Sequence, residues 1–344
     1  MAGIDQDTAK PVLALEPSAY CDAGAYERER DAIFKKSWRL VGHENMAPNS
    51  GDYFSDSLAG VPIVVVRQED GTLKGHHNIC RHRAGPLVAD SKGHCGKELT
   101  CKYHGWRYAL DGRLKSARDF GAVEGFDPRD YVLTPVTIGT WRGFVFATLN
   151  ERPAPIADEM QAVGEDWPDQ TVAPFAFQRS HNIACNWKTY VENYLEGYHV
   201  PDVHPGLDKE VDSSAYRVEM KDATAVHYAP PLSKDAVYSG YWGWVWPWVG
   251  VNVYQYGVMM ERITPISVCE TRLDYLYFFD PDRHDELNAM IAMSDEVTNE
   301  DKMICEHVAK NLNAGTYQPG PLSLKHENAV LWFHDRLRQL MGYK

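Results

Sequence analysis

The chain has 344 residues, enough for about two domains, and 44% hydrophobic with 24% charged residues is usual for a globular protein. Its formal net charge of -13 disfavours nucleic acid and anionic membrane surfaces as partners, because both require a basic face. The longest aliphatic run, residues 61–66, is too short to span a bilayer, and residues 1–11 lack the apolar core of a signal peptide. Seven cysteines in no regular framework predict reduced thiols and a cytoplasmic location.

The first predicted elements are a helix and a β-rich domain. Residues 25–36 have a helical pattern, and we expect residues 1–37 to form an N-terminal helical segment that packs on a later domain. An all-β domain is predicted over residues 38–150, where turn signals such as Asp111-Gly112 separate short strand-like runs at residues 60–66, 107–110 and 136–149.

Two mixed cysteine–histidine doublets lie in this β-rich stretch. Cys-Arg-His at 80–82 and Cys-Lys-Tyr-His at 101–104 have eighteen residues between them. Four such side chains could hold a tetrahedral zinc ion, but zinc sites usually pair cysteine with cysteine and histidine with histidine. Ligand softness and spacing favour a Rieske [2Fe–2S] cluster, in which two histidines replace two cysteines on one iron. The predicted cluster ligands are Cys80, His82, Cys101 and His104.

The residues around both doublets resemble the Rieske domain of the ring-hydroxylating oxygenase family. The likeness covers residues 78–83, Gly85-Pro86 and, after the second doublet, Gly105 and Trp106. This resemblance implies a terminal oxygenase whose [2Fe–2S] cluster passes electrons to a mononuclear Fe(II) that activates O2. It also implies that NAD(P)H supplies the electrons through a flavin reductase, sometimes with a ferredoxin. The implied assembly is a homotrimer or a hexamer, in which cluster and iron of adjacent subunits come close.

The second predicted domain is an α+β catalytic domain over residues 151–344, which begins with a proline-rich linker. Apolar spacing predicts a helix at Trp187–Tyr198. Alternating and apolar runs predict strands at 251–254 and 272–279, and helices at 284–313 and 325–341. We therefore expect an antiparallel sheet flanked by helices.

Two histidines near the end of the first of these helices are candidate iron ligands. Pro201 and Pro205 disfavour helix just before them, which places His199 at a fraying helix end and His204 in an extended stretch. Two histidines across a helix break can converge on one metal, as in the 2-His-1-carboxylate triad of Fe(II) oxygenases. The family resemblance, which includes Asn-Trp-Lys at 186–188, implies that both are iron ligands. The alternative is a pair of ordinary loop histidines.

The carboxylate of such a triad has to come from the C-terminal helices. With Thr298 or Asn299 as an N-cap, Asp301 would lie in the first turn and face the core. Glu300 would then point about 100° away from it. The family pattern of an acidic pair before an apolar helix also indicates Asp301, with Asp295 as second choice among the candidates Asp295, Glu296, Glu300 and Asp301.

Glu196 precedes His199 by one helical turn. The resemblance implies that it takes the place of the family's bridging carboxylate, usually an aspartate, which links a metal-ligating histidine to a cluster histidine of the neighbouring subunit. Such a carboxylate fixes the tautomer of each imidazole that it contacts. The alternative is a solvated helix glutamate.

Aromatic residues are dense between positions 241 and 256. Tryptophans alternate along a predicted strand, so they could form one wall of a pocket or a cation–π cage for a quaternary ammonium group. The alternative is a place in the core or in a subunit interface. The candidate substrate-binding residues are Trp244, Trp246, Trp248 and Tyr254.

The chain most resembles the branch of the family that oxidises quaternary amines such as choline, glycine betaine, carnitine and stachydrine. The expected reaction is therefore N-demethylation or C-hydroxylation of a small substrate. An aromatic ring-hydroxylating dioxygenase would share both metal sites and is the main alternative. A Rieske electron carrier would need only the first domain.

Overall fold

The computed structural model describes residues 10–167, 173–234 and 236–344. The chain forms two compact units. One contains Arg30–Phe175, and the other combines the beginning of the chain, through Glu29, with Ala176–Lys344. The β-rich unit is therefore inserted into the sequence of the other unit.

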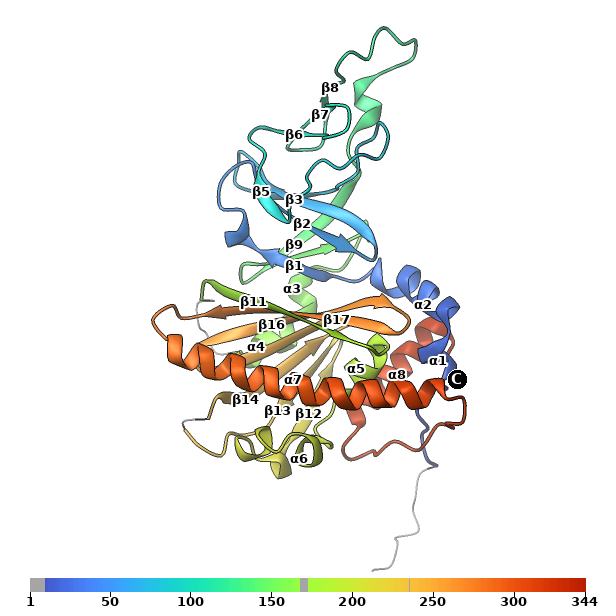
Figure 1. Cartoon of the computed structure of the whole chain (residues 1–344), viewed down its shortest axis with the longest axis vertical. Coiled ribbons are helices and arrows are strands. Elements are labelled where there is room, and N and C mark those ends of the chain that lie inside the picture. Colours follow the sequence, from blue (N-terminus) through green and yellow to red (C-terminus); the bar gives the residue numbers. More distant parts are fainter. Residues whose placement is uncertain (1–9, 168–172, 235) are drawn as a thin grey trace, which may run out of the picture. The chain divides into compact units, whose positions relative to one another are not determined.

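The inserted unit is built from antiparallel strands (Figure 1). Its larger sheet has the order β1-β10-β9-β4-β3-β2-β5. The strands of this sheet are β1 (Arg39–His43), β2 (Asp52–Leu58), β3 (Val61–Arg67), β4 (Leu73–His77), β5 (Lys92–His94), β9 (Pro135–Trp141) and β10 (Phe144–Thr148). A smaller sheet contains β6 (Glu98–Thr100), β7 (Arg107–Ala109) and β8 (Leu114–Ser116). Short helical turns lie at Arg30–Phe34, Glu44–Met46 and Pro128–Tyr131.

The core of this unit lies next to the two cysteine–histidine doublets. Val64 and Val66 are buried on β3 and share one apolar cluster with Trp106 and Tyr108. The same cluster contains both cysteines of the doublets, Cys80 and Cys101, each 2% exposed. Burial of β-branched side chains therefore provides a rigid base for the loops that carry the doublets.

Two short helices, α3 (Ile156–Glu159) and α4 (Gln161–Asp166), follow β10. Ile156 lies so close to Gly139 of β9 that a side-chain carbon at position 139 would come within 2.8 Å of it. This contact joins α3 to the inserted unit, which extends to Phe175, whereas the sequence pattern placed the boundary at residue 151. Residues 30–37 likewise belong to the inserted unit rather than to the N-terminal segment.

The other unit contains a seven-stranded sheet with helices. The order is β11-β17-β16-β15-β14-β13-β12, and the pairs from β12 to β17 are antiparallel. The strands are β11 (Phe175–Ile183), β12 (Arg217–Lys221), β13 (Thr224–Tyr228), β14 (Tyr238–Val245), β15 (Val249–Tyr254), β16 (Gly257–Ser267) and β17 (Glu270–Phe279). The helices are α1 (Ser18–Cys21), α2 (Ala23–Glu29), α5 (Trp187–Tyr194), α6 (Val200–Val203), α7 (His284–Asn313) and α8 (Asn328–Met341), with 3-10 turns at Leu207–Lys209 and Ser213–Ala215.

Helices α5, α7 and α8 pack on the same face of this sheet, and α7 runs along it (Figure 1). Tyr275 of β17 contacts Thr298 of α7 through hydroxyl oxygens 2.9 Å apart. Farther along this face, Phe333 of α8 packs edge-on against Trp244 of β14, with 5.7 Å between the ring centroids. The predicted α+β class, with an all-β domain and an antiparallel sheet flanked by helices, is confirmed. No helix among the described residues combines the length and apolar composition that crossing a bilayer requires.

The N-terminal helices pack against α5. The Lys188 ammonium lies 2.5 Å from a carboxylate oxygen of Glu29, and the Trp187 indole donates to the other oxygen at 2.8 Å. The Tyr20 hydroxyl donates to Glu192 at 2.6 Å. These contacts join the beginning of the chain to the helix that leads to the candidate iron ligands.

Candidate metal centres and substrate cavity

The two doublets lie on tight loops that follow β4 and β6. The amide of Cys80 donates to the Gly85 carbonyl at 2.9 Å, and the amide of Cys101 donates to the Trp106 carbonyl at 2.8 Å. The loops also contact each other, because the Lys102 amide donates to the Pro86 carbonyl at 3.2 Å. Each loop therefore presents its cysteine and histidine in a fixed backbone geometry.

The cysteines point inward, and the histidines are only partly buried. The close approach of the two loops requires a glycine at position 85, because a side-chain carbon there would lie 2.9 Å from the Cys101 sulfur. The rings of His82 and His104 have centroids 4.6 Å apart, and His82 stacks on Trp106 at 4.8 Å. Inner thiols and outer imidazoles fit a cluster with one cysteine-ligated and one histidine-ligated iron.

The four side chains of the doublets do not surround a single point as the ligands of one zinc ion would. Among the described residues, only His199, His204 and Asp301 form a group of three or more metal-ligating side chains whose ligand atoms lie within 4.8 Å of one another. The Tyr108 hydroxyl lies 3.2 Å from the Cys80 sulfur and accepts the Arg81 amide at 3.1 Å. A hydrogen bond to a ligand sulfur is one of the interactions by which a protein adjusts an iron–sulfur cluster. The donor set and its spacing therefore fit a two-iron cluster.

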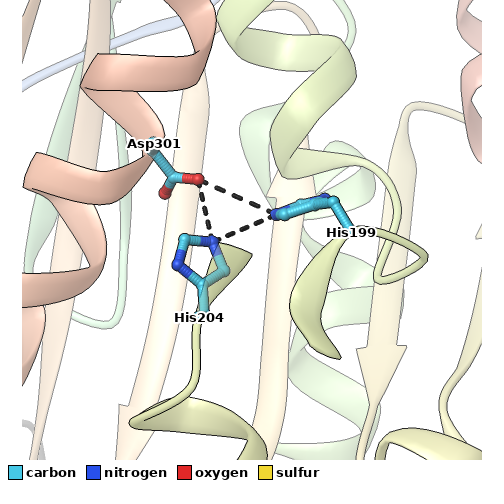
Figure 2. Close-up of side chains that lie close together, drawn as sticks. All are labelled: His199, His204 and Asp301. Atoms are coloured by element: carbon cyan, nitrogen blue, oxygen red, sulfur yellow. Dashed lines mark hydrogen bonds and ion pairs between the residues drawn. The ribbon is translucent and has the colours of Figure 1, made fainter. Parts of the chain in front are cut away.

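The second centre consists of His199, His204 and Asp301, whose polar atoms converge (Figure 2). The Nε2 atoms of the two histidines are 3.1 Å apart. Asp301 Oδ1 lies 3.0 Å from Nε2 of His204 and 3.8 Å from Nε2 of His199. Two nitrogens and one carboxylate oxygen on one side of a point match a facial triad and leave its other side open.

The chain reaches this centre by a path that the helical pattern did not predict. Helix α5 ends at Tyr194 rather than at residue 198. His199 then precedes α6, in which Pro201 occupies the first turn, where a missing amide costs no hydrogen bond. His204 is the C-cap that follows the last residue of α6, Val203, and is not part of an extended stretch. The two histidines therefore flank one helical turn.

Asp301 lies in the middle of the 30-residue helix α7 and not in the first turn of a helix. An N-cap at position 298 is absent because Thr298 is itself helical and its hydroxyl donates to the Ser294 carbonyl at 2.6 Å. The Asn193 amide of α5 donates to Asp301 Oδ1 at 2.6 Å. Asp301 is thus held in place from a second helix.

Each histidine of the triad is oriented by a carboxylate on its other nitrogen. Glu196 Oε1 lies 2.5 Å from His199 Nδ1, and its Oε2 accepts the amides of Tyr198 and His199. Glu300 Oε2 lies 2.7 Å from His204 Nδ1. Burial lowers the pKa of His204, but hydrogen bonds with Asp301 and Glu300 raise it more. Such carboxylates leave both Nε2 atoms facing the centre.

The other acidic candidates lie outside the triad. Glu300 contacts His204 Nδ1, on the side of the ring opposite Asp301. Asp295, the second choice for a ligand, forms an ion pair with Arg179 and faces His181 at 3.6 Å. The structure therefore brings Asp301, and not Asp295, to the two histidines.

A cavity with many aromatic side chains adjoins the triad. Its described lining includes the triad and the rings of Tyr190, Tyr194, Tyr238, Trp242, Tyr254 and Tyr275. Of the four aromatic residues proposed from the sequence, only Tyr254 lines it. Trp244 shares a sheet face with Trp242 but is covered by α8, whereas Trp246 and Trp248 follow the end of β14 at Val245. A strand that stops before position 246 cannot place all the alternating tryptophans on one wall.

Glu261 of β16 also lines the cavity and was not identified from the sequence. The only signal in the sequence was a single acid within the strand-like run between Val258 and Ile263. Burial, with a smaller effect of the Asp301 charge, raises the pKa of Glu261 to about 8.

Comparison with known proteins identifies both halves of the chain. Residues 37–127 match the Rieske [2Fe-2S] domain, and residues 175–343 match the catalytic domain of the ring hydroxylating alpha subunit. The chain is 31% identical to the carnitine monooxygenase oxygenase subunit of Escherichia coli K12, over 93% of this chain and 92% of that protein. It is 28% identical to the chloroplastic choline monooxygenase of Beta vulgaris, over 96% and 78% of the respective chains.

A solved structure has the same fold. It is that of a quaternary ammonium Rieske monooxygenase, which superposes with a TM-score of 0.87 and 24% identity. The match covers 96% of each chain.

Proposed function

This chain belongs to the Rieske ring-hydroxylating oxygenases, and from that premise we propose that it oxidises a quaternary ammonium compound. It is the terminal component of such an oxygenase, and its cofactors are a Rieske [2Fe–2S] cluster and a mononuclear iron. In this family NAD(P)H acts through a separate reductase.

The proposed ligands follow from the two constellations described above. Two buried thiols and two outer imidazoles would hold the cluster, and the triad would hold the iron. When bound, these groups supply electron transfer and O2 activation. The chain itself fixes the tautomers of His199 and His204 through Glu196 and Glu300, and holds Asp301 through Asn193. The proposed ligands are Cys80, His82, Cys101 and His104 for the cluster, and His199, His204 and Asp301 for the iron.

The aromatic cavity next to the triad is the observation that supports this substrate class. Trp242, Tyr190 and Tyr275 line it from one helix and two strands of the same unit. Aromatic faces attract quaternary ammonium groups, which cannot donate hydrogen bonds and are recognised mainly by their charge and shape. The carnitine and choline monooxygenases among the relatives act, by their names, on substrates of this class.

The test is a turnover screen of the protein reconstituted with iron, a generic reductase and NADH. We expect O2 consumption and an oxidised product with at least one of choline, glycine betaine and L-carnitine. Naphthalene should not stimulate turnover. Formation of a cis-diol from naphthalene, with no product from any of the amines, would instead establish an aromatic dioxygenase.

We further propose that the protein works as a homotrimer, or a hexamer of two, with a flavin reductase as electron donor. In this assembly Glu196 would link His199 to a cluster histidine of the neighbouring subunit. The 2.5 Å contact between Glu196 and His199 supports one half of that link. A cytoplasmic location remains our proposal, in keeping with five cysteines outside the proposed cluster, none of which forms a disulfide bond.

A further inference from the structure

Glu261 is a buried carboxylate that faces the substrate cavity. It lies on β16 and is 1% exposed. Among the described residues, its Oε1 atom has no hydrogen-bond partner. An unpaired buried carboxylate oxygen is costly, so its presence requires an explanation.

The neighbouring strand leaves this carboxylate uncovered. Gly250 of β15 is the residue opposite Glu261. A side-chain carbon at position 250 would lie 3.2 Å from Glu261 Oε2 and 3.1 Å from the Tyr194 hydroxyl. On the other side, Tyr275 of β17 is the residue opposite Glu261 and also lines the cavity. The glycine therefore preserves space between a carboxylate and aromatic rings.

Among the described residues, Glu261 forms no ion pair with a lysine or arginine side chain of the cavity. The described residues that line the cavity include no lysine and no arginine. Other buried acids of the same unit are paired: Asp274 lies 3.2 Å from Arg262, and Glu29 lies 2.5 Å from Lys188. Burial raises the pKa of Glu261 to about 8, a hydrogen bond with Tyr190 opposes this rise, and the Asp301 charge adds to it. A cation that enters the cavity would supply the missing partner.

We propose that the Glu261 carboxylate receives the cationic nitrogen of the substrate and so selects cations over neutral molecules of the same shape. This inference rests on the proposed function and makes it specific. Tyr194 and Tyr275 line the same cavity as Glu261, and their rings would add cation–π attraction. Glu261 is a binding residue that contacts the substrate, not a ligand of the iron.

The experiment measures equilibrium binding to the holoenzyme of two probes of similar size, tetramethylammonium and neutral tert-butanol. Glu261→Gln should weaken binding of tetramethylammonium at least about tenfold and leave that of tert-butanol unchanged. Glu270→Gln is the matched control, because Glu270 lies in β17 of the same unit, carries the same charge and is not among the described residues that line the cavity. It should retain the wild-type preference for the cation.

Wild-type affinity of Glu261→Gln for tetramethylammonium would overturn the inference. If the glutamine variant fails to fold, Glu261→Asp provides the second test, because it keeps the charge and shortens its reach. Glu261→Asp should weaken the binding of tetramethylammonium more than that of tert-butanol. Equal weakening of both affinities would overturn the proposal.

The outcome separates this inference from the proposed function. If the wild type oxidises a quaternary amine and Glu261→Gln does so with an unchanged KM, the function stands and the role of Glu261 is wrong. If the wild type oxidises no amine but binds tetramethylammonium through Glu261, the cation site stands and the proposed function is wrong.

Discussion

At the residue scale, the geometry of the triad depends on the side chains that contact its three proposed ligands as well as on the ligands themselves. Nδ1 of each histidine faces a carboxylate, at 2.5 Å for His199 and 2.7 Å for His204. Because one nitrogen of each ring is engaged, the other is presented to the centre in a single tautomer. Asp301 is also held by a neighbouring side chain, because its Oδ1 atom accepts a hydrogen bond from the Asn193 side-chain amide.

We predict that Asp301→Ala loses the mononuclear iron and nearly all turnover while the cluster spectrum stays intact, because the two sites have separate ligands. Iron content per chain and the absorption spectrum of the cluster are the measurements. Asp295→Ala is the matched control, since Asp295 lies on the same helix and pairs with Arg179. Full iron in Asp301→Ala and depletion in Asp295→Ala would reverse the ligand assignment.

These ligand candidates could be found from the sequence because they lie in short, chemically distinctive patterns. His199 and His204 are five positions apart, and each cluster doublet is contained in four residues or fewer. Glu261 and Gly250 could not be found in this way. Their relation exists only through the pairing of β15 with β16, and a single acid in a strand carries no sign of what faces it.

At the scale of elements, α5 connects the fold to the site. The apolar pattern of this segment continues through Leu195 to Tyr198, which explains the longer helix predicted from the sequence. Gly197 changes the path: a side-chain carbon there would lie 2.5 Å from the ring of Tyr216. Tyr198 is 58% exposed, so its place in the pattern did not reflect burial. Tertiary packing therefore decided where the helix ends.

Replacement of Lys188 by methionine should destabilise the protein by roughly 3–5 kcal/mol, because it leaves the carboxylate of Glu29 buried without its cation. Denaturant unfolding measured on the holoenzyme tests this. Lys209→Met, at an exposed position after α6, should change the free energy of unfolding by less than about 0.5 kcal/mol. Equal effects of the two substitutions would contradict a structural role for the buried pair.

At the scale of the whole molecule, the chain combines a Rieske unit with a catalytic unit whose sequence lies on both sides of it. The sequence predicted two domains of the right classes, because the change from short strands to longer helical patterns is visible in the order of residues. It did not predict that residues 151–175 stay with the β-rich unit. The packing of Ile156 against Gly139 joins α3 to that unit, and nothing in the sequence around Gly139 indicates this contact.

Glu196→Gln tests the proposed link between subunits. The substitution keeps the shape of the side chain but removes the charge that orients two imidazoles, so both metals should stay bound. Reduction of the cluster by the reductase should be unchanged, while its reoxidation with O2 and substrate should slow roughly 10–100-fold. Stopped-flow absorbance of the cluster measures both steps, and Glu196→Asp should be milder.

Sedimentation supplies the control for this prediction. The wild type and Glu196→Gln should both sediment as a trimer or a multiple of it. An active monomer, or wild-type reoxidation in the glutamine variant, would reduce Glu196 to a residue that orients His199 within its own subunit.

The contact between Glu29 and Tyr343 has a consequence for biosynthesis. The Tyr343 hydroxyl donates to Glu29 at 2.5 Å across 314 positions of the chain. At roughly 5–20 residues per second, a ribosome needs about 15–60 seconds to make the intervening segment. The inserted β-rich unit is complete long before that interval ends, while α1 and α2 wait for α5 and then for Tyr343. Co-translational folding should therefore complete the inserted unit first, and Glu29 should reach its final contacts only after Tyr343 has left the ribosome.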